Sequence, residues 1–539
     1  MKNKFSNEST YKKFLDLNKE AEFDKLFNQA IEKAKQSFGS KYPMHINGKT
    51  IYTQEQLIEQ SPIDRSIIIG YFQKANRDHA KQAIEAASSA FEAWASLNYK
   101  ERANIFRKIA KAFSEQKFEL AAILSYENGK SRYESIGEVD EAIDFINYYT
   151  NELEINKGFA RKTHSSGAYQ KIEKGFQGAP GEEENVTIML KPYGVFGVIA
   201  PFNFPLSISV GMSVGALITG NTVVFKPSTD NMTLLTALKI YEIFKNNGLP
   251  DNVFNLVTGP GSEVGDEFVV NNNVAGIIFT GSRTVGMNMI KKVFGEEKQK
   301  IFVVEMGGKN PAIVSKYANL DKAVQGVANA AFGFVGQKCS ALSRCYVHES
   351  LKELFVSKLI DKLRSFKIGN PLDKDVFIGP LISENALNKF NDAVQKAKQS
   401  GRILYGGNVI KSELKGFYVE PTLIELSHNN ELVHKELFLP ILSIETFKDF
   451  DNALKLANDS EYGLTAGLYS QNKKEIKEFS NKINAGVVYI NRRISATTGA
   501  IVGLHTFVGW KGSGLTGKGT GSKHYLQQFM KEQSISLSK

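Results

Sequence analysis

The spacing of apolar and polar residues predicts a chain that begins with helices and continues with alternating strands and helices. Between residues 11 and 36, Phe14, Phe23 and Phe27 recur at helical spacing, which predicts an N-terminal helical extension. A short hairpin with an Asn-Gly turn is predicted at residues 44–49. We therefore expect an all-helical start that contains one small β element.

The helical pattern resumes at Asn76, which suits a helix N-cap, and continues to Tyr149. A polar stretch rich in glycine and serine then covers residues 156–185 and leads into the strand-like residues 186–191. We expect a protruding hairpin with a loose tip here, and a disordered linker is the alternative.

Two later regions alternate short apolar runs with segments of helical length. Such alternation indicates parallel sheets covered by helices on both faces, and these sheets bind ligands beyond the carboxyl ends of their strands. In the first region, strands are expected at residues 195–200, 221–226, 253–257, 275–280 and 301–305, and helices at 206–219, 232–247, 263–270 and 284–294. In the second, helices are expected at 320–332, 351–366, 385–400 and 450–458, and strands at 345–347, 417–423 and 440–447. The tail from Ile494 is rich in glycine and threonine, and its residues 525–530 can add a strand.

Composition narrows the classes of protein that the chain can represent. Two cysteines in 539 residues fit a reducing compartment, and the N-terminus lacks the apolar core of a signal peptide, so a cytoplasmic location is expected. The net charge of +10 is spread along the chain without a basic stripe, so we expect no nucleic-acid partner. Residues 193–221 are uncharged but interrupted by prolines, which argues against a membrane span. No metal site is predicted.

Cys339 is the candidate nucleophile. It lies in a glycine-flanked turn between the helix expected at 320–332 and the strand expected at 345–347. A thiol in such a turn can be exposed to a cleft, as a nucleophile must be, although a small buried hydrophobe is the commoner fate of a free cysteine. Cys345, an alternate residue of an apolar strand, is expected to have that second fate.

Two further polar residues follow buried strands. Asn203, between aromatic residues and prolines, is either a turn residue or a fixed amide donor for a developing oxyanion. Glu305 follows three apolar residues, so its carboxyl group can have a raised pKa and take a proton from water. A salt bridge between Glu305 and Lys309 is the alternative.

Three glycine-containing motifs carry weaker signals. Gly259-x-Gly261-x-x-x-Gly265 misses the dinucleotide-binding spacing by one residue. The Gly281-Ser282 pair follows a strand and precedes a helix, so it can hold a phosphate, or it can be an ordinary turn. Gly211-x-Ser213-x-Gly215 matches a hydrolase elbow but lies inside an apolar helix, which excludes that interpretation.

Cysteine hydrolases usually pair the thiol with a histidine, and no histidine lies in these motifs. A Cys, Glu and Asn set suits attack on an aldehyde, loss of a hydride and hydrolysis of the resulting thioester. From about His45 to Ser534 the chain resembles the aldehyde dehydrogenase superfamily. The resemblance rests on the order and spacing of residues 201–205 (Pro-Phe-Asn-Phe-Pro), 225–228 (Phe-Lys-Pro-Ser), 279–282 (Phe-Thr-Gly-Ser), 305–309 (Glu-Met-Gly-Gly-Lys) and 336–339 (Gly-Gln-Lys-Cys).

The resemblance implies a role for each motif. Cys339 would be the nucleophile, Asn203 and the Cys339 backbone N–H would hold the oxyanion, and Glu305 would activate the hydrolytic water. Residues implied to bind the cofactor are Lys226, Ser228 and Thr229 at the adenosine ribose, Gly281 and Ser282 at the pyrophosphate, and Glu436 and Phe438 at the nicotinamide. Residues implied to receive a substrate carboxylate are Ser340, Gly499 and Ala500.

The resemblance also implies an α/β fold with two parallel-sheet domains, a protruding β element for oligomerisation and an N-terminal helical extension. The expected boundaries are 1–40 for the extension, 41–155 and 192–305 for the NAD(P)-binding domain, 306–490 for the catalytic domain, and 156–191 with 491–539 for the oligomerisation hairpin and tail. A homodimer, or a larger homo-oligomer built from dimers, is expected.

Within the superfamily, residues 333–344 and 498–503 resemble the branch that oxidises L-glutamate γ-semialdehyde (1-pyrroline-5-carboxylate) to L-glutamate in proline or arginine breakdown. Thr229 stands where the family usually has a glutamate that repels the 2′-phosphate of NADP, so NAD is expected and NADP is the alternative. Residues 494–496 resemble an insertion beside the carboxylate loop, which leaves another semialdehyde, such as succinic semialdehyde, as the alternative substrate. A third hypothesis, a non-enzymatic relative or an RNA-binding protein, is opposed by the intact Cys339, Asn203 and Glu305.

Overall fold

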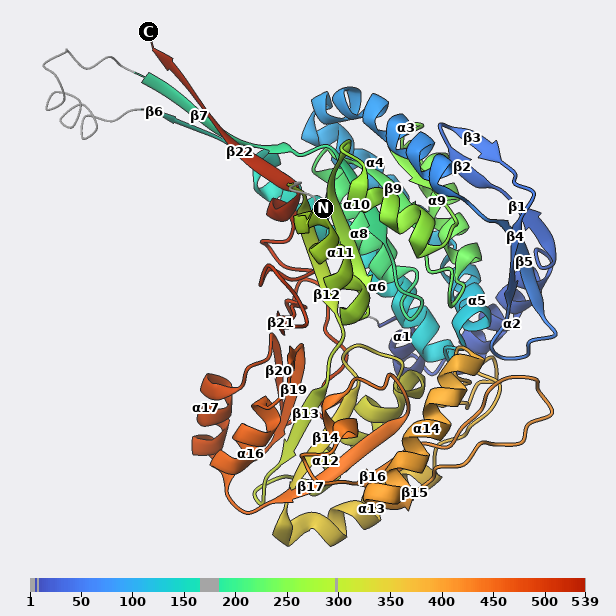
Figure 1. Cartoon of the computed structure of the whole chain (residues 1–539), viewed down its shortest axis with the longest axis vertical. Coiled ribbons are helices and arrows are strands. Elements are labelled where there is room, and N and C mark those ends of the chain that lie inside the picture. Colours follow the sequence, from blue (N-terminus) through green and yellow to red (C-terminus); the bar gives the residue numbers. More distant parts are fainter. Residues whose placement is uncertain (1–4, 7–8, 165–183, 296–298, 539) are drawn as a thin grey trace, which may run out of the picture.

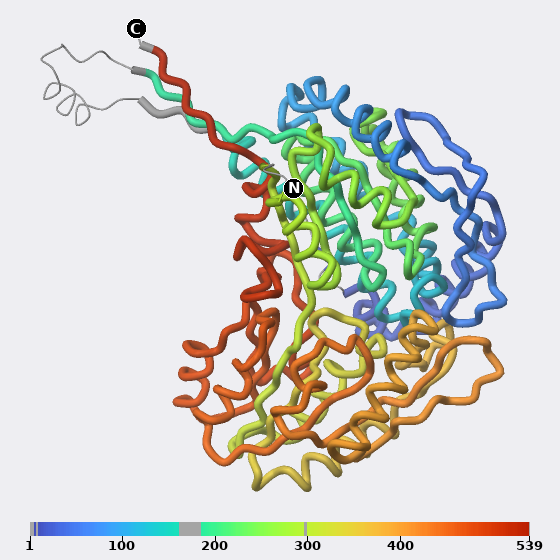
Figure 2. Tube along the Cα trace, viewed as in Figure 1, coloured from blue at the N-terminus to red at the C-terminus, as the bar shows by residue number. Residues whose placement is uncertain are grey.

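The computed structural model describes residues 5–6, 9–164, 184–295 and 299–538. Figure 1 shows two α/β bodies, one above the other, with a long arm that projects from the upper body. Figure 2 shows that the upper body is built mainly from the first 300 residues and the lower body from later ones, while the C-terminal segment returns along both to the arm.

The upper body contains a seven-stranded sheet with the strand order β12-β11-β8-β9-β10-β2-β3. Neighbours from β12 to β10 pair in parallel, whereas the β2–β3 hairpin joins antiparallel. The parallel sheet predicted for this region is therefore confirmed. The strands are β2 (Met44–Ile46), β3 (Lys49–Ile51), β8 (Val195–Ile199), β9 (Thr222–Lys226), β10 (Phe254–Leu256), β11 (Val274–Gly281) and β12 (Ile301–Met306).

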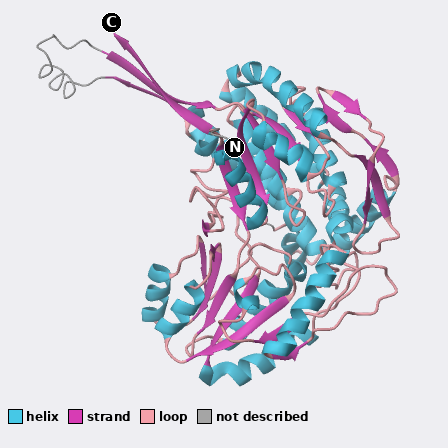
Figure 3. Cartoon of the chain, in the orientation of Figure 1, coloured by secondary structure: helices cyan, strands magenta, loops and turns pink. Residues whose placement is uncertain are grey.

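Helices cover both faces of this sheet (Figure 3). They are α3 (Arg77–Ser96), α4 (Tyr99–Glu115), α5 (Lys117–Asn128), α6 (Arg132–Ile155), α8 (Ser207–Ile218), α9 (Leu234–Asn246), α10 (Asp266–Val270) and α11 (Arg283–Gly295). The uncharged stretch around α8 forms strand, loop and helix as expected. Among the described residues, no helix has the length and apolar composition needed to cross a membrane.

Two local predictions in the upper body are confirmed by backbone geometry. Asn47 and Gly48 have φ angles of 55° and 68°, the left-handed pair that a two-residue hairpin turn requires. The Asn76 side chain accepts the His79 backbone N–H, and the His79 side chain accepts the Asn76 N–H, so Asn76 caps α3 as predicted.

The N-terminal extension is helical, but it forms two helices. These are α1 (Thr10–Asp16) and α2 (Glu20–Lys35), and Asn18 between them has a φ of 55°. Phe23 and Phe27 are buried, as the helical spacing predicted, and α2 packs on α5. The apolar spacing therefore predicted the buried face but not the break.

A second small sheet was missed, so the prediction of a single β element near the start was wrong. It has the order β1-β5-β4, with β1 (Ser40–Tyr42), β4 (Gln56–Gln60) and β5 (Ile68–Gln73). Only β5 is mainly buried, while β1 and β4 are largely polar and partly exposed. Short edge strands of this composition carry little period-two signal.

The lower body contains a second seven-stranded sheet with the order β15-β16-β17-β14-β13-β19-β20, parallel except for β15. Its strands are β13 (Asn310–Val314), β14 (Leu342–His348), β15 (Arg402–Tyr405), β16 (Thr422–Glu425), β17 (Ile441–Phe447), β19 (Thr465–Tyr469) and β20 (Val487–Ile490). Its helices are α12 (Leu320–Phe332), α13 (Lys352–Arg364), α14 (Glu384–Ser400), α15 (Glu431–His434), α16 (Phe450–Asn458) and α17 (Lys473–Lys482). The strand expected at 417–423 was misplaced, because it begins only at Thr422.

The arm is a three-stranded antiparallel sheet with the order β22-β7-β6. It joins β6 (Ala160–His164) and β7 (Glu184–Pro192) to the C-terminal β22 (Met530–Ser538), as Figure 1 shows. The predicted hairpin is thus present, and its predicted loose tip lies outside the described residues. The strand expected at 525–530 was wrong, because Leu526–Phe529 form a 3₁₀ turn and the strand starts at Met530.

Candidate active site

The parallel register brings the ends of four strands of the upper sheet to one edge. Lys226, the last residue of β9, is paired with Ile199 of β8, and Ile199 is paired with Phe279 of β11. Thr280 of β11 is paired in turn with Glu305 of β12. The loop that carries Asn203 therefore leaves the sheet between the β9 and β11 ends, at the edge where ligands of such sheets bind.

Cys339 follows a turn whose backbone is left-handed over three successive residues. Phe334, Val335 and Gly336, between α12 and the cysteine, have φ angles of 50°, 55° and 68°. Each non-glycine residue in this region costs about 1–2 kcal/mol. At Gly336 an added Cβ would overlap the Leu439 carbonyl, so glycine is required there. The backbone before the cysteine is thus strained and must be held by its surroundings.

A buried charge pair supports this turn. Lys130, which is fully buried after α5, forms an ion pair with Glu138 of α6. The Lys130 ammonium lies 3.4 Å from the Phe204 ring centroid and 4.8 Å from that of Phe334. Glu138 also accepts the backbone N–H of Leu206 at 2.8 Å. One ion pair therefore contacts both the Asn203 loop and the turn before Cys339.

The Cys339 side chain is partly accessible, whereas Cys345 in β14 is buried. The buried position predicted for Cys345 is confirmed, while the role of Cys339 as a nucleophile stays a prediction. Burial raises the pKa of Cys339 to about 12, and the charges of Glu436 and Glu305 add to the rise, while the backbone N–H groups of Ser340 and Cys339 oppose it. The thiol is consequently protonated at neutral pH.

Asn203 is buried, and its amide nitrogen donates a hydrogen bond to the Gln337 carbonyl at 3.1 Å. Gln337 stands two residues before the cysteine, and its side-chain oxygen accepts the Ile382 backbone N–H at 2.9 Å. A primary amide has two N–H donors, so one remains for another acceptor. The structure thus brings Asn203 to the cysteine turn.

Glu305 accepts the backbone N–H of Gly509 at 3.0 Å. Burial raises the pKa of Glu305 well above that of an ordinary carboxyl group, and the Gly509 N–H offsets only part of this effect. The raised pKa agrees with the prediction. Among the described residues, Lys309 forms no salt bridge with Glu305, so the alternative interpretation of this carboxylate is wrong.

Glu436 lies against the glycine pair that follows β12. One carboxylate oxygen accepts the Gly308 backbone N–H at 2.8 Å, and a Cβ at Gly307 would overlap that carboxylate. Burial raises the pKa of Glu436 to about 7, although the Gly308 N–H and the charge of Lys309 act to lower it. Phe438, two residues later, has a left-handed φ of 62° and packs edge-on against Phe202.

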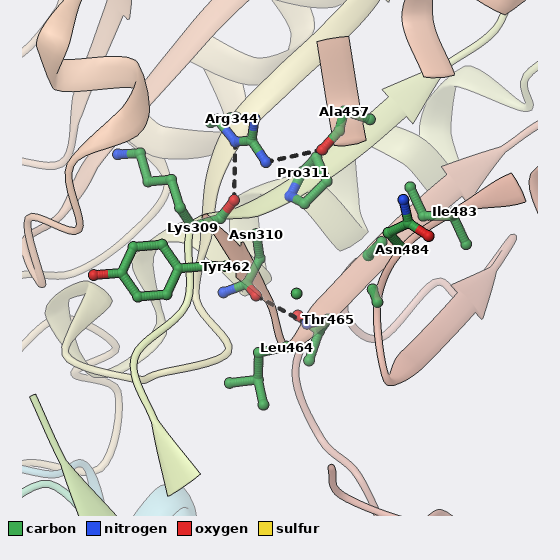
Figure 4. Close-up of a pocket in the computed structure, with 13 residues that line it drawn as sticks. Lys309, Asn310, Pro311, Arg344, Ala457, Tyr462, Leu464, Thr465, Ile483 and Asn484 are labelled. Atoms are coloured by element: carbon green, nitrogen blue, oxygen red, sulfur yellow. Dashed lines mark hydrogen bonds between the residues drawn. The ribbon is translucent and has the colours of Figure 1, made fainter. Parts of the chain in front are cut away.

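Residues after Gly308 form hydrogen bonds that connect the end of β12 to the loop that carries Cys339. The Asn310 amide donates to the Cys339 carbonyl at 2.8 Å and to the Ala341 carbonyl at 2.9 Å, and its oxygen accepts the Thr465 N–H at 3.0 Å. Arg344 donates to the Lys309 carbonyl at 2.9 Å, as the dashed lines of Figure 4 show. Asn310 was not predicted as a site residue, although it directly follows the motif at residues 305–309.

The residues expected at the adenosine ribose and the pyrophosphate lie along the same sheet edge, whereas Glu436 and Phe438 lie in the loop between α15 and β17. The Lys226 ammonium is buried and donates to the Pro227 carbonyl at 3.1 Å, and burial lowers its pKa to about 8. Thr229 donates to the Gly259 carbonyl at 3.2 Å. Ser282 accepts the Val285 N–H at 3.4 Å at the start of α11. An ammonium, hydroxyl groups and a helix N-terminus at strand ends form a donor set suited to a dinucleotide.

The loop before Gly499 reaches the residue after the cysteine. Thr497 donates a hydrogen bond from its hydroxyl group to the Ser340 carbonyl at 2.7 Å. Gly499 has a φ of 81°, and Gly499 and Ala500 are both partly exposed. This hydrogen bond places the loop that leads to Gly499 and Ala500 beside Ser340, and the role of these three residues at a substrate carboxylate stays a prediction.

The described residues contain one close cluster of metal-ligand types, made of His428, His434 and Asp459. Both ring nitrogens of His428 already have protein partners, the Tyr346 hydroxyl at 2.9 Å and the Asp459 carboxylate at 2.9 Å. His434 contacts the His428 carbonyl at 2.8 Å. These residues therefore form a hydrogen-bonded network in the lower body.

The comparison with known proteins covers nearly the whole chain. Residues 52–535 match the model of the aldehyde dehydrogenase family. The chain belongs to that family. The family and the α/β fold predicted from the sequence are therefore confirmed, while the domain boundaries and the roles of single residues stay predictions.

Relatives within the aldehyde dehydrogenase family are similar over their full length. 1-Pyrroline-5-carboxylate dehydrogenase 1 of Halalkalibacterium halodurans is 36% identical over 518 residues, covering 95% of this chain and 96% of the relative. 1-Pyrroline-5-carboxylate dehydrogenase 2 of Bacillus subtilis is 35% identical, with 95% of both chains covered. The structure of 1-pyrroline-5-carboxylate dehydrogenase from Thermus with bound NAD is 33% identical, has a TM-score of 0.87 and covers 96% of each chain.

Proposed function

We propose that this aldehyde dehydrogenase oxidises L-glutamate γ-semialdehyde to L-glutamate with NAD as the hydride acceptor. The observation that carries the proposal is the convergence of a partly accessible Cys339 with the Asn203 amide and the Glu305 carboxyl group at one sheet edge. The similarity to proteins named 1-pyrroline-5-carboxylate dehydrogenase supports the choice of substrate.

In the first half of the reaction, Cys339 attacks the aldehyde carbon and forms a thiohemiacetal. The oxygen becomes an oxyanion, which the free N–H of Asn203 and the Cys339 backbone N–H stabilise. Because the pKa of Cys339 is raised, its proton must pass to a base. The carboxylates whose charges act on the sulfur, Glu436 and Glu305, are the bases available there.

NAD fits the donor set at the strand ends, and when bound it supplies the acceptor for the hydride. Lys226, Ser228 and Thr229 would hold the adenosine ribose, and Gly281 and Ser282 the pyrophosphate. Glu436 and Phe438 would hold the nicotinamide riboside. Thr229 carries no charge and is bonded to Gly259, so only modest discrimination against the 2′-phosphate of NADP is expected.

In the second half, Glu305 removes a proton from the water that attacks the thioester carbon. The C–S bond breaks, Cys339 leaves as a thiolate and the product carboxylic acid is released. Only the deprotonated form of Glu305 can act as the base, so its raised pKa makes this step faster as pH rises. The Gly509 N–H fixes the carboxylate that does this work.

The substrate carboxylate would be received by Ser340 and by the backbone N–H groups of Gly499 and Ala500. We also propose that the arm mediates assembly into homodimers or larger oligomers, since among the described residues its outer strands β6 and β22 pair only with β7. A cytoplasmic location and a role in proline or arginine breakdown complete the proposal. Light scattering of the intact protein tests the assembly, and a monomer at micromolar concentration would contradict it.

The decisive experiment is a panel of aldehydes ranked by kcat/KM with both NAD and NADP. We expect glutamate γ-semialdehyde to rank first, and a higher value for succinic semialdehyde would favour the alternative substrate. Cys339→Ala should abolish cofactor reduction, whereas Cys345→Ala should keep it, because Cys345 lies in the core of β14. Cofactor reduction that survives Cys339→Ala would refute the assigned nucleophile.

A further inference from the structure

Arg492 clamps the loop that ends at Gly499 and Ala500. Its guanidinium group donates to the Thr498 carbonyl at 3.0 Å and to the Gly499 carbonyl at 2.7 Å. The guanidinium also stacks over the Tyr489 ring, 4.7 Å from its centroid. No sequence motif marks Arg492.

These two hydrogen bonds determine where the neighbouring N–H groups point. In a trans peptide the carbonyl and the N–H that follows it point in opposite directions. Once Arg492 holds the Thr498 and Gly499 carbonyls on one side, the N–H groups of Gly499 and Ala500 face the other side. The left-handed φ of 81° at Gly499 brings the two peptide units into this arrangement. Successive N–H groups in such a conformation form an anion-binding concavity.

The pair of N–H groups also lacks partners in the part of the chain that the structure describes. On either side, the Thr498 N–H donates to the Ser495 hydroxyl at 3.0 Å, and the Ile501 N–H donates to His505 at 3.1 Å. Those of Gly499 and Ala500 have no acceptor among the described residues. Only the two donors that Arg492 orients are therefore left for a ligand.

We propose that Arg492 is a positioning residue that sets the selectivity of this enzyme for aldehydes bearing a distal carboxylate. It acts from behind the loop, since both of its terminal nitrogens donate to the two carbonyls, and the backbone N–H groups make the contact. The Thr497–Ser340 hydrogen bond at 2.7 Å fixes this loop relative to the residue after Cys339. The inference rests on the proposed function. It assigns to the Arg492 side chain the orientation of the N–H groups that would bind the substrate carboxylate.

Two substitutions of Arg492 distinguish a role in positioning the loop from a general role in folding. Arg492→Met keeps an apolar stem without donors, and Arg492→Lys keeps the charge but not the planar pair of donors. Hydrogen bonds to charged groups contribute about 1.5–3 kcal/mol each, which corresponds to a change of at least tenfold in kcat/KM. We expect the ratio of kcat/KM for glutamate γ-semialdehyde to that for pentanal to fall tenfold or more in Arg492→Met, mainly through KM, with a smaller fall in Arg492→Lys. Arg493→Met is the matched control, because that side chain is exposed.

A ratio within twofold of the wild-type value, or an equal loss on both aldehydes, would overturn the inference. Glutarate provides an independent measurement, as a competitive inhibitor of pentanal oxidation. Its Ki should rise at least tenfold in Arg492→Met and stay unchanged in Arg493→Met. If the wild-type enzyme showed no preference for the semialdehyde, the proposed substrate would fail, and the glutarate Ki would still decide the role of Arg492. No inhibition of the wild type, or an equal Ki in Arg492→Met, would refute that role.

Discussion

Replacement of Lys130 by methionine should destabilise the upper body strongly. The change keeps an unbranched side chain but removes the charge that pairs with Glu138 and lies between the Phe204 and Phe334 rings. Loss of one partner of a buried ion pair costs about 3–5 kcal/mol. Glu138 keeps the Leu206 and Ser207 N–H donors at 2.8 and 3.2 Å, so we expect the lower end, about 3 kcal/mol.

Urea unfolding measures this loss. Trp94 is buried in the upper body, so its fluorescence in a Trp510→Phe background reports on that body. The double variant Lys130→Met/Glu138→Gln should recover part of the stability, because no unpaired charge remains buried. Lys358→Met is the control, since its ion pair with Asp321 is exposed, and it should have a much smaller effect.

A loss in Lys130→Met no greater than that in the control would refute the reasoning. It would mean that Glu138 is satisfied by its two backbone donors and that the ammonium adds nothing. A second readout follows from the turn before the cysteine. Alkylation of Cys339 by iodoacetamide should change in rate in Lys130→Met, because the strained Phe334 backbone loses a contact that holds it.

Three more predictions concern single residues. Glu305→Gln should give a burst of NADH and then turn over about 10²–10⁴-fold more slowly, as expected for loss of a general base. Steady turnover equal to wild type would contradict this. In the wild type, the rate of thioester hydrolysis should rise with pH through the raised pKa of Glu305. Gly336→Ala should give little folded protein, because its Cβ would overlap the Leu439 carbonyl, and normal yield and activity would show that the turn relaxes. Burial raises the pKa of Glu127 to about 7 and that of Glu59 well above its usual range. The stability that these two groups contribute is present below about pH 4.5 and is lost as pH rises, for Glu127 through about 7. Glu59→Gln should remove much of this pH dependence, and urea midpoints at pH 5 and 8 that shift equally in both proteins would contradict it.

The regular part of the fold was predictable because its signals are local. The alternation of apolar strands and amphipathic helices from Val195 to Glu305 reflects a sheet buried on both faces, and each predicted element there is present with shifted ends. The Asn76 cap and the Asn-Gly hairpin depend on neighbouring residues alone. The edge strands β1 and β4 and the start of β16 were missed or misplaced, because pairing with distant strands determines them.

The residues of the candidate site were likewise predictable only where a local sequence signal marks them. Cys339, Asn203 and Glu305 could be chosen because each lies at or after the end of a regular element and has a side chain suited to one chemical step. Lys130 could not, since it contacts Phe204 and Phe334, which are distant in the sequence. Arg492 bonds to carbonyl groups only six and seven residues later, but no motif marks it. The left-handed backbone at Val335 was equally hidden, because a β-branched residue normally avoids that conformation and only the packed structure imposes it.

The pairing of β22 with β7 has a consequence for the order of events during protein synthesis. Met530 lies opposite Pro192, so about 340 residues must be translated after β7 before its partner exists. At about 5–20 residues per second, this takes roughly 20–70 s. During that time β7 has one neighbour, β6, and an unprotected edge, although the sheet next to it can already form. The arm therefore stays incomplete until β22 has been translated, after the strands of both seven-stranded sheets.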